Sequence, residues 1–128
     1  MNNMMKIFVV FLGGIFGGLA RYELNDSIPK IGIFPLGTIV INLLGCFLFA
    51  LIVKRYLVAK NVSEKVILAV GTGFFGAFTT FSSATLDAAQ LMNAGHFWML
   101  LLYFALELIG GLSMIALGLS AGRRWFQK

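Results

Sequence analysis

The chain has 128 residues, of which 59% are hydrophobic and only 12% are charged, and its formal net charge is +5. A soluble core of this size could not bury so much apolar surface, so the composition predicts one membrane domain. Cys46 is the single cysteine, which excludes an intrachain disulfide and a cysteine metal cluster. No catalytic triad, acid pair or nucleotide-binding motif occurs, so we expect no enzyme. The basic charge indicates membrane anchoring and not nucleic-acid binding.

Four apolar stretches are each long enough to cross a membrane. They predict an all-α membrane protein with spans at residues 4–20, 35–53, 66–92 and 97–121. The first stretch also has the general shape of a signal peptide, with Lys6 before the apolar run and Ala20 at its end, an alternative that leaves three spans. Within it, Gly13 and Gly17, and likewise Gly14 and Gly18, have the small-xxx-small spacing that favours close helix packing.

The basic residues are distributed unevenly between the two sides of such a four-span chain. The side with both termini and the central loop holds eight of them: Lys6, Lys54, Arg55, Lys60, Lys65, Arg123, Arg124 and Lys128. The other side holds two, Arg21 and Lys30. By the positive-inside rule, both termini are predicted to be cytoplasmic, and the chain is predicted to insert in one orientation.

The third span contains the stretch GTGFFGAFTTFSSAT, residues 71–85, in which nine of fifteen residues are Gly, Ser or Thr. This composition weakens a helix and predicts a break, whose freed carbonyls are typical cation ligands. The alternative is a continuous helix whose small residues pack against neighbours. Helical spacing also predicts that Phe74, Phe78 and Phe81 share one face, in lipid or core contact, or with a ring edge toward an anion.

Polar side chains also occur inside the other spans. Thr38 and Asn42 are four residues apart and share a helical face, as either an interhelical hydrogen bond or part of a site. Arg21 ends the first span, where it either extends to the interface or attracts anions. Tyr103 and Glu107 lie one turn apart in the fourth span. An ionised acid at the centre of a span costs roughly 2.5–3.5 kcal/mol, so Glu107 must be protonated, paired or hydrated, and it is a functional candidate.

Three segments in order, GGIFGGLARY, GTIVINLLG and GTGFFGAFTTFSS, resemble the signatures of the Fluc (CrcB) fluoride channels. The resemblance covers nearly the whole chain and implies passive fluoride efflux through a bacterial plasma-membrane channel. It further implies an antiparallel dimer with two fluoride pathways and a central structural sodium ion, held by the backbone carbonyls of Gly76 and Thr79. It places along the fluoride pathway the residues Thr38, Asn42, Thr80, Phe81, Ser83 and Tyr103, with Arg21 at the vestibule.

Two positions depart from this pattern. Similar chains read TTFSTF, whereas Ala84 here stands in place of the second pore phenylalanine, and Glu107 puts an acid in the polar track. Together with the charge bias, these departures suggest a partner that is an oppositely oriented homologue, with one degenerate pathway. A homodimer remains open, as do two other functions: a proton-coupled four-helix transporter that uses Glu107, and a non-conducting partner subunit.

Overall fold

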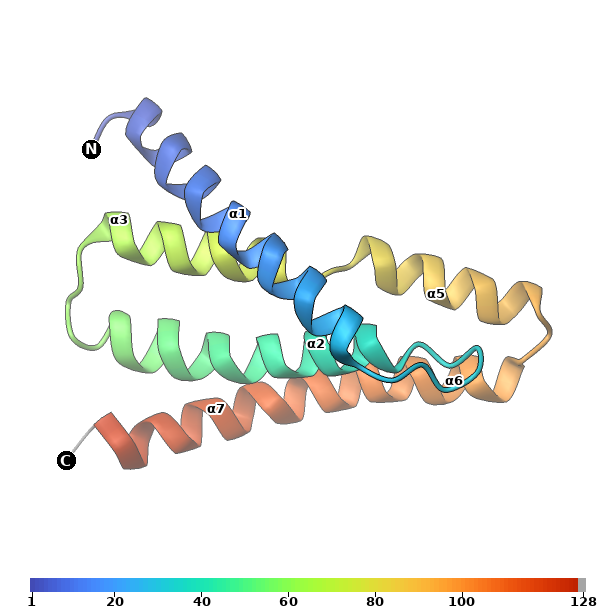
Figure 1. The fold of residues 1–128 in the computed structure, drawn as a ribbon. Coiled ribbons are helices and arrows are strands. Elements are labelled where there is room, and N and C mark those ends of the chain that lie inside the picture. Colours follow the sequence, from blue (N-terminus) through green and yellow to red (C-terminus); the bar gives the residue numbers. More distant parts are fainter. Residues whose placement is uncertain (127–128) are drawn as a thin grey trace.

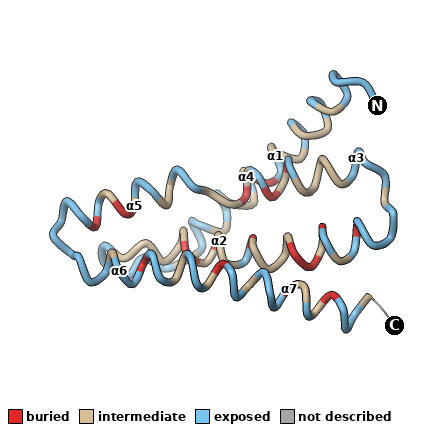
Figure 2. Tube along the Cα trace, turned by 180° about the vertical axis from the view of Figure 1, so that it is seen from behind, coloured by how far each residue is buried: buried red, intermediate tan, exposed pale blue. Residues whose placement is uncertain are grey.

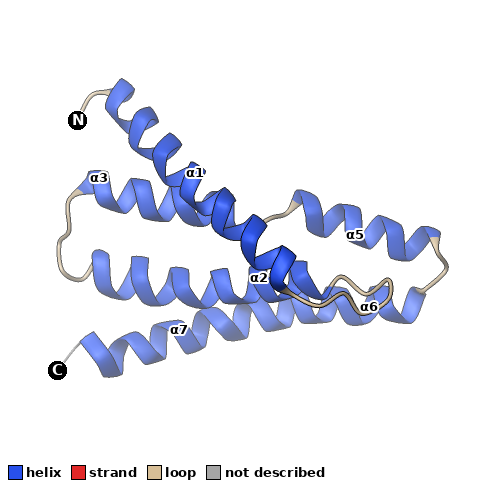
Figure 3. Cartoon of the chain, viewed as in Figure 1, coloured by secondary structure: helices blue, strands red, loops and turns tan. Residues whose placement is uncertain are grey.

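The computed structural model describes residues 1–126, whose regular structure is helical (Figure 3). Four long apolar helical segments are able to cross a membrane: Asn3–Ser27, Leu36–Leu57, Glu64–Asn93 and Phe97–Phe126. They confirm the predicted all-helical protein with four candidate spans. Each segment extends beyond the apolar stretch that predicts it, because backbone hydrogen bonds continue a helix into polar residues. Lys128, one of the residues in the predicted charge bias, lies outside the described residues.

Most of these segments combine α-helical and wider π-helical turns. The first is one helix, α1 (Asn3–Ser27). The second comprises α2 (Leu36–Leu48) and η1 (Phe49–Leu57). The third comprises α3 (Glu64–Ile67), η2 (Leu68–Phe75), α4 (Gly76–Phe78) and α5 (Ser82–Asn93). The fourth comprises α6 (Phe97–Ala105), η3 (Leu106–Gly110) and α7 (Gly111–Phe126).

The connection between α5 and α6 is a tight left-handed turn at Gly95, which has φ +75°. The amide of His96 donates to the carbonyl of Leu91, and the amide of Gly95 to that of Met92, both at 3.0 Å. These two bonds form a Schellman motif, which satisfies the last carbonyls of α5. Glycine suits this turn because other residues are strained at positive φ. The turn reverses the chain, so α6 runs back beside the third segment.

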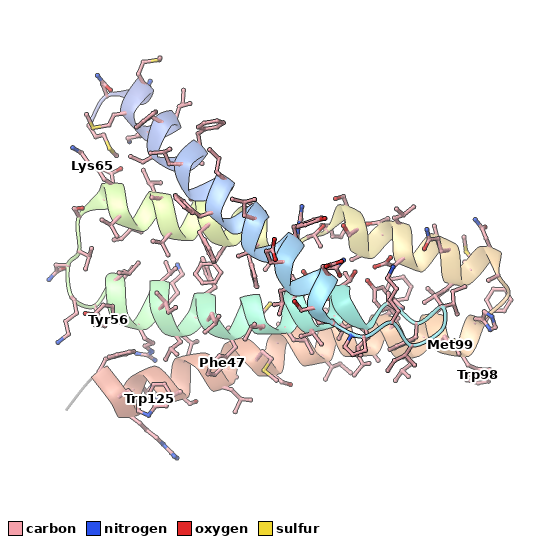
Figure 4. All side chains as sticks on the ribbon, in the orientation of Figure 1. Phe47, Tyr56, Lys65, Trp98, Met99 and Trp125 are labelled. Carbon is pink, nitrogen blue, oxygen red and sulfur yellow. The ribbon has the colours of Figure 1, made fainter. Side chains whose placement is uncertain are left out.

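The N-terminus, the end of α7 and the 58–63 loop lie at the same end of the bundle, while the 28–35 loop and the α5–α6 turn lie at the other (Figure 1). The end with the termini therefore carries most of the basic residues of the predicted charge bias. Trp125 lies near this end and Trp98 at the opposite end, and both are exposed (Figure 4). Tryptophans in these two places are typical of the two membrane interfaces.

Helix α1 crosses the third segment diagonally and packs on it through two glycines (Figure 1). A Cβ atom on Gly13 would overlap the carbonyl of Ala69, and one on Gly17 would overlap the carbonyl of Phe74. A Cβ atom on Gly18 would meet nothing within 4 Å. The close approach of the two backbones therefore depends on Gly13 and Gly17, which is one of the two predicted small-residue pairs.

The outer faces of all four segments remain exposed (Figure 2). Large apolar side chains such as Phe8, Phe11, Leu108 and Ile109 are each 59–67% exposed. The buried side chains form two small clusters: Ile41, Val53, Leu57, Phe75 and Phe78, and Ile39, Ala88, Leu91 and Tyr103. Exposing such an apolar surface to water is unfavourable, so we expect lipid or another membrane subunit to cover it.

Candidate functional site

The third segment changes conformation at Thr79. Helix α4 ends at Phe78, Thr79 is extended with φ −78° and ψ 158°, and α5 begins only at Ser82. The hydroxyl of Thr79 donates to the carbonyl of Phe75 at 2.8 Å, and the Thr79 amide donates to the same carbonyl at 3.1 Å. The last turn of α4 is thus completed by Thr79 itself, and residues 79–81 lie between the two helices.

Asn42 in α2 holds Thr80 by both of its backbone groups. The amide of Thr80 donates to Asn42 Oδ1 at 2.9 Å, and Asn42 Nδ2 donates to the carbonyl of Thr80 at 3.0 Å. In a continuous helix, the Thr80 amide would instead donate to the carbonyl of Gly76, four residues earlier. Asn42 therefore makes the interhelical hydrogen bond that was one of its two expected roles. In doing so, it keeps the Thr80 amide from making a helical hydrogen bond.

The backbone amide of Ser83 also departs from the helical hydrogen-bond pattern. The amide of Ser83 donates to the hydroxyl of Thr80 at 3.1 Å, and not to the carbonyl of Thr79. The carbonyls of Gly76 and Thr79 are thus both released from their helical partners. Gly76 is exposed, and a Cβ atom there would meet nothing within 4 Å. The two released carbonyls are neutral oxygen ligands of the kind that hard cations bind.

Beside this segment lies a cavity of about 460 Å³, which we term the Asn42 cavity. Its lining residues are Asn42, Cys46, Thr79, Thr80, Phe81, Ala84, Thr85, Ala88, Tyr103, Phe104 and Glu107. Glu107, in η3, accepts hydrogen bonds from Asn42 Nδ2 through both carboxylate oxygens at 3.2 Å. Tyr103 is 1% exposed, and its hydroxyl has no hydrogen-bond partner among residues 1–126.

A second cavity, the vestibule, has a volume of about 320 Å³ and adjoins the first at Thr80, which lines both. Its lining residues are Gly18, Arg21, Tyr22, Asn25, Thr38, Ile41, Thr80, Ser83, Leu86 and Asp87. The hydroxyl of Thr38 donates to Asp87 Oδ2 at 2.6 Å. The sequence contains no signal for this pair, because Thr38 and Asp87 are 49 positions apart.

The phenylalanines of the third segment do not share one face, so that prediction was wrong. Phe74 and Phe78 stack with ring centroids 5.7 Å apart, and Phe78 is buried. Phe81, in contrast, is 88% exposed. The extended backbone at Thr79 interrupts the helical periodicity, so Phe81 does not continue the face of Phe74 and Phe78 and instead lines the Asn42 cavity.

The expected site residues therefore gather at three adjoining places. Asn42, Thr80, Phe81, Tyr103 and Glu107 line the Asn42 cavity. Arg21, Thr38, Thr80 and Ser83 line the vestibule. Gly76 and Thr79 line a third cavity, of about 270 Å³, together with Gly71 and Phe75. Among the described residues, no group of three or more His, Cys, Asp or Glu side chains is arranged to hold a metal ion.

Comparison with known proteins places this geometry in context. The family model described as "CrcB-like protein, Camphor Resistance (CrcB)" matches residues 8–119. "Fluoride-specific ion channel FluC 2" of Streptococcus pneumoniae (strain ATCC BAA-255 / R6) is 46% identical over 103 residues, or 80% of this chain and 83% of that protein. "Fluoride-specific ion channel FluC 1" of Bacillus cereus (strain ATCC 10987 / NRS 248) is 39% identical over 124 residues, or 93% and 90%.

A third relative, "Fluoride-specific ion channel FluC" of Azobacteroides pseudotrichonymphae, is 42% identical over 115 residues, or 88% of this chain and 92% of that protein. The family model reaches into all four helical segments and covers every residue that lines the three cavities. The chain belongs to the CrcB family, which is a family of ion channels and not of enzymes.

Proposed function

We propose that this chain is a subunit of a fluoride channel in the bacterial plasma membrane, where it gives passive fluoride efflux and lowers cytoplasmic fluoride. The observation that carries the proposal is the convergence of Asn42, Thr80, Phe81 and Tyr103 on one cavity between the helices. Relatives that cover most of the chain are named fluoride-specific ion channels, which supports fluoride as the ion.

The polar groups of the proposed pathway form a sequence of weak sites for an anion. Arg21 would attract anions to the vestibule, and the hydroxyls of Thr38 and Ser83 line it. Thr80 then connects the vestibule to the Asn42 cavity, where Phe81 offers the electropositive edge of its ring. Conduction needs sites that bind an ion and also release it, which a lysine inside the pathway would hinder.

We further propose that the chain assembles as an antiparallel dimer. Phe81 is exposed and extends outward from the chain, in a position to line a pathway shared with a partner subunit. In the cell, the basic residues would keep both termini of this chain in the cytoplasm, so its partner there must insert in the opposite orientation. Purified chains in detergent are free of this constraint and can pair in antiparallel fashion with one another. Numbered names such as FluC 1 and FluC 2 are consistent with two homologous chains in one organism, and we favour such a homologue as the partner.

The dimer centre is where a structural sodium ion would bind. The released carbonyls of Gly76 and Thr79 would provide two oxygen ligands from this chain, and the partner would provide the others. Bound there, sodium would supply fixed positive charge that compensates the converging carbonyl dipoles. The two hydrogen bonds between Asn42 and the Thr80 backbone support this role, because they keep the Thr80 amide from bonding the Gly76 carbonyl.

Removing sodium is therefore expected to destabilise the assembled protein. An ion that binds only the native state stabilises it by mass action, and complete exchange into choline chloride should lower the melting temperature by about 5–10 °C. Thermal unfolding in detergent at equal ionic strength, with sodium or choline, measures the effect. Identical melting temperatures after exhaustive exchange would remove sodium from the account.

The function itself is tested in the bacterium that encodes the chain. Deletion of the gene should raise cellular fluoride several-fold in an acidic fluoride medium, because hydrogen fluoride enters and ionises in the cytoplasm. The wild-type gene should restore low fluoride, whereas Phe81→Ile should not, since isoleucine has no ring edge to face the ion. Phe11→Ile, at a residue that is 62% exposed on α1, is the matched control and should behave as wild type. An unchanged fluoride content in the deletion strain would contradict the proposal.

A further inference from the structure

Glu107 uses the donor that the Asn42 cavity would otherwise offer to an anion. A primary amide has two N–H groups. One of those on Asn42 Nδ2 goes to the Thr80 carbonyl at 3.0 Å, and both Glu107 oxygens lie 3.2 Å from the same nitrogen. Asn42 Oδ1 accepts from the Thr80 amide at 2.9 Å. Because one N–H group of Asn42 bonds the Thr80 carbonyl and the other bonds Glu107, Asn42 has no N–H group left for an ion that enters the cavity.

The second potential donor lies beside the same carboxylate. Tyr103 precedes Glu107 by one helical turn, so the two side chains share a face. Its hydroxyl is buried and has no partner within hydrogen-bonding geometry among the described residues, and both side chains line the Asn42 cavity. Glu107 is also the charged residue among those that line this cavity, whose other walls are mainly apolar. The carboxylate thus accepts from Asn42 and lies one helical turn from the unpaired Tyr103 hydroxyl, in a cavity with a largely apolar wall.

We propose that the Glu107 carboxylate is a built-in occupant of a small-anion subsite formed by Asn42 and Tyr103, and that it closes this chain's own cavity to fluoride. This inference rests on the proposed fluoride-channel function. A carboxylate, like fluoride, is an anion that accepts hydrogen bonds from N–H and O–H groups, so it can take the place of fluoride at these donors. Because it is covalently attached, its effective concentration at the donors far exceeds that of a dissolved ion. It also repels any second anion through a medium of low dielectric constant.

This arrangement assigns different tasks to the two subunits of the proposed dimer. The weak anion sites described above line the pathway of this chain, but Glu107 closes that pathway at the Asn42 cavity in the wild-type protein. Fluoride then passes through the equivalent pathway of the partner, whose corresponding position carries no acid. Phe81 lines the Asn42 cavity but is 88% exposed, so its ring would also be available to line the partner's pathway. Glu107 is then a specificity-determining residue, because it decides which of the two pathways accepts fluoride.

The test compares fluoride efflux from liposomes that contain purified wild-type chain, Glu107→Ser or Glu107→Gln. Serine removes both the charge and the bulk of the occupant, so Glu107→Ser should conduct at least about tenfold faster than wild type, equivalent to about 1.4 kcal/mol. Glutamine removes the charge but keeps the size, so its efflux should lie between the two. Asp26→Asn removes an exposed acid outside the cavity and is the matched control, with efflux equal to wild type.

A second measurement separates this inference from the channel function. Fluoride should raise the melting temperature of Glu107→Ser in detergent, relative to chloride, and should leave that of the wild-type chain unchanged. If fluoride stabilises only Glu107→Ser and no variant shows efflux, the role assigned to Glu107 is supported and the channel function is refuted. Efflux by wild type that neither Glu107 variant increases, or equal fluoride stabilisation of wild type and variants, would overturn the assignment. If Glu107→Ser does not fold, Glu107→Gln decides by the same two criteria.

Discussion

Asn42→Ala should abolish the sodium-dependent stabilisation of the protein and lower its stability at the same time. The substitution removes both hydrogen bonds between Asn42 and the backbone of Thr80. Each buried polar group that is left unpaired costs about 1–3 kcal/mol. The freed Thr80 amide can then bond the carbonyl of Gly76, as in a continuous helix, and this withdraws a carbonyl from the proposed sodium site. Thermal unfolding in sodium and in choline chloride reads out both effects.

Two further variants make this prediction specific. Asn93→Ala replaces an exposed asparagine near the end of α5 and should keep the full sodium response. The double variant Asn42→Ala/Glu107→Ser should lose less stability than the sum of the single changes, because Glu107 is no longer left without its donor. A sodium response in Asn42→Ala equal to that of wild type would show that Thr80 does not control the Gly76 carbonyl.

Two neighbouring glycines of α1 should respond to the same substitution with opposite signs. An alanine Cβ at Gly17 would overlap the carbonyl of Phe74, whereas at Gly18 it would meet nothing within 4 Å. Overpacking against a backbone group costs about 1–3 kcal/mol or more, while alanine gains about 1 kcal/mol over glycine in helix propensity. Gly17→Ala should therefore separate α1 from the third segment and destabilise the protein, and Gly18→Ala should be neutral or stabilising.

The measurement is the melting temperature and the monodisperse yield of each variant in the same detergent. Gly13→Ala should resemble Gly17→Ala, because its Cβ atom would overlap the carbonyl of Ala69. Equal stability of Gly17→Ala and Gly18→Ala would contradict the close packing of α1 on the third segment.

The helices themselves were predictable because each contains an apolar run, interrupted by at most one charged residue, that is long enough to cross a bilayer. Their ends were not, since hydropathy marks only the apolar part of a helix and Ser27 or Phe126 remains helical through backbone hydrogen bonds. The glycine spacing in α1 offered two equivalent pairs. Only the position of the neighbouring backbone decides that Gly13 and Gly17 are the pair in contact.

The site was predictable where residues share a helix and unpredictable where they meet across helices. Tyr103 and Glu107 line one cavity, as their spacing of one turn suggests. The composition of residues 71–85 indicates weak helicity, but the residue that leaves the helix is determined by Asn42, which lies 38 positions from Thr80. The same tertiary contact explains why helical periodicity failed to describe Phe81.

The most direct test of the fluoride-channel proposal is fluoride efflux from voltage-clamped liposomes. Two preparations are needed, one with this chain alone as the Glu107→Ser variant and one with the wild-type chain purified with its oppositely oriented homologue. We predict rapid fluoride efflux in both, without chloride efflux and without any requirement for a proton gradient. The absence of fluoride efflux from both preparations of folded protein, or efflux that stops when the proton gradient is removed, would contradict the account.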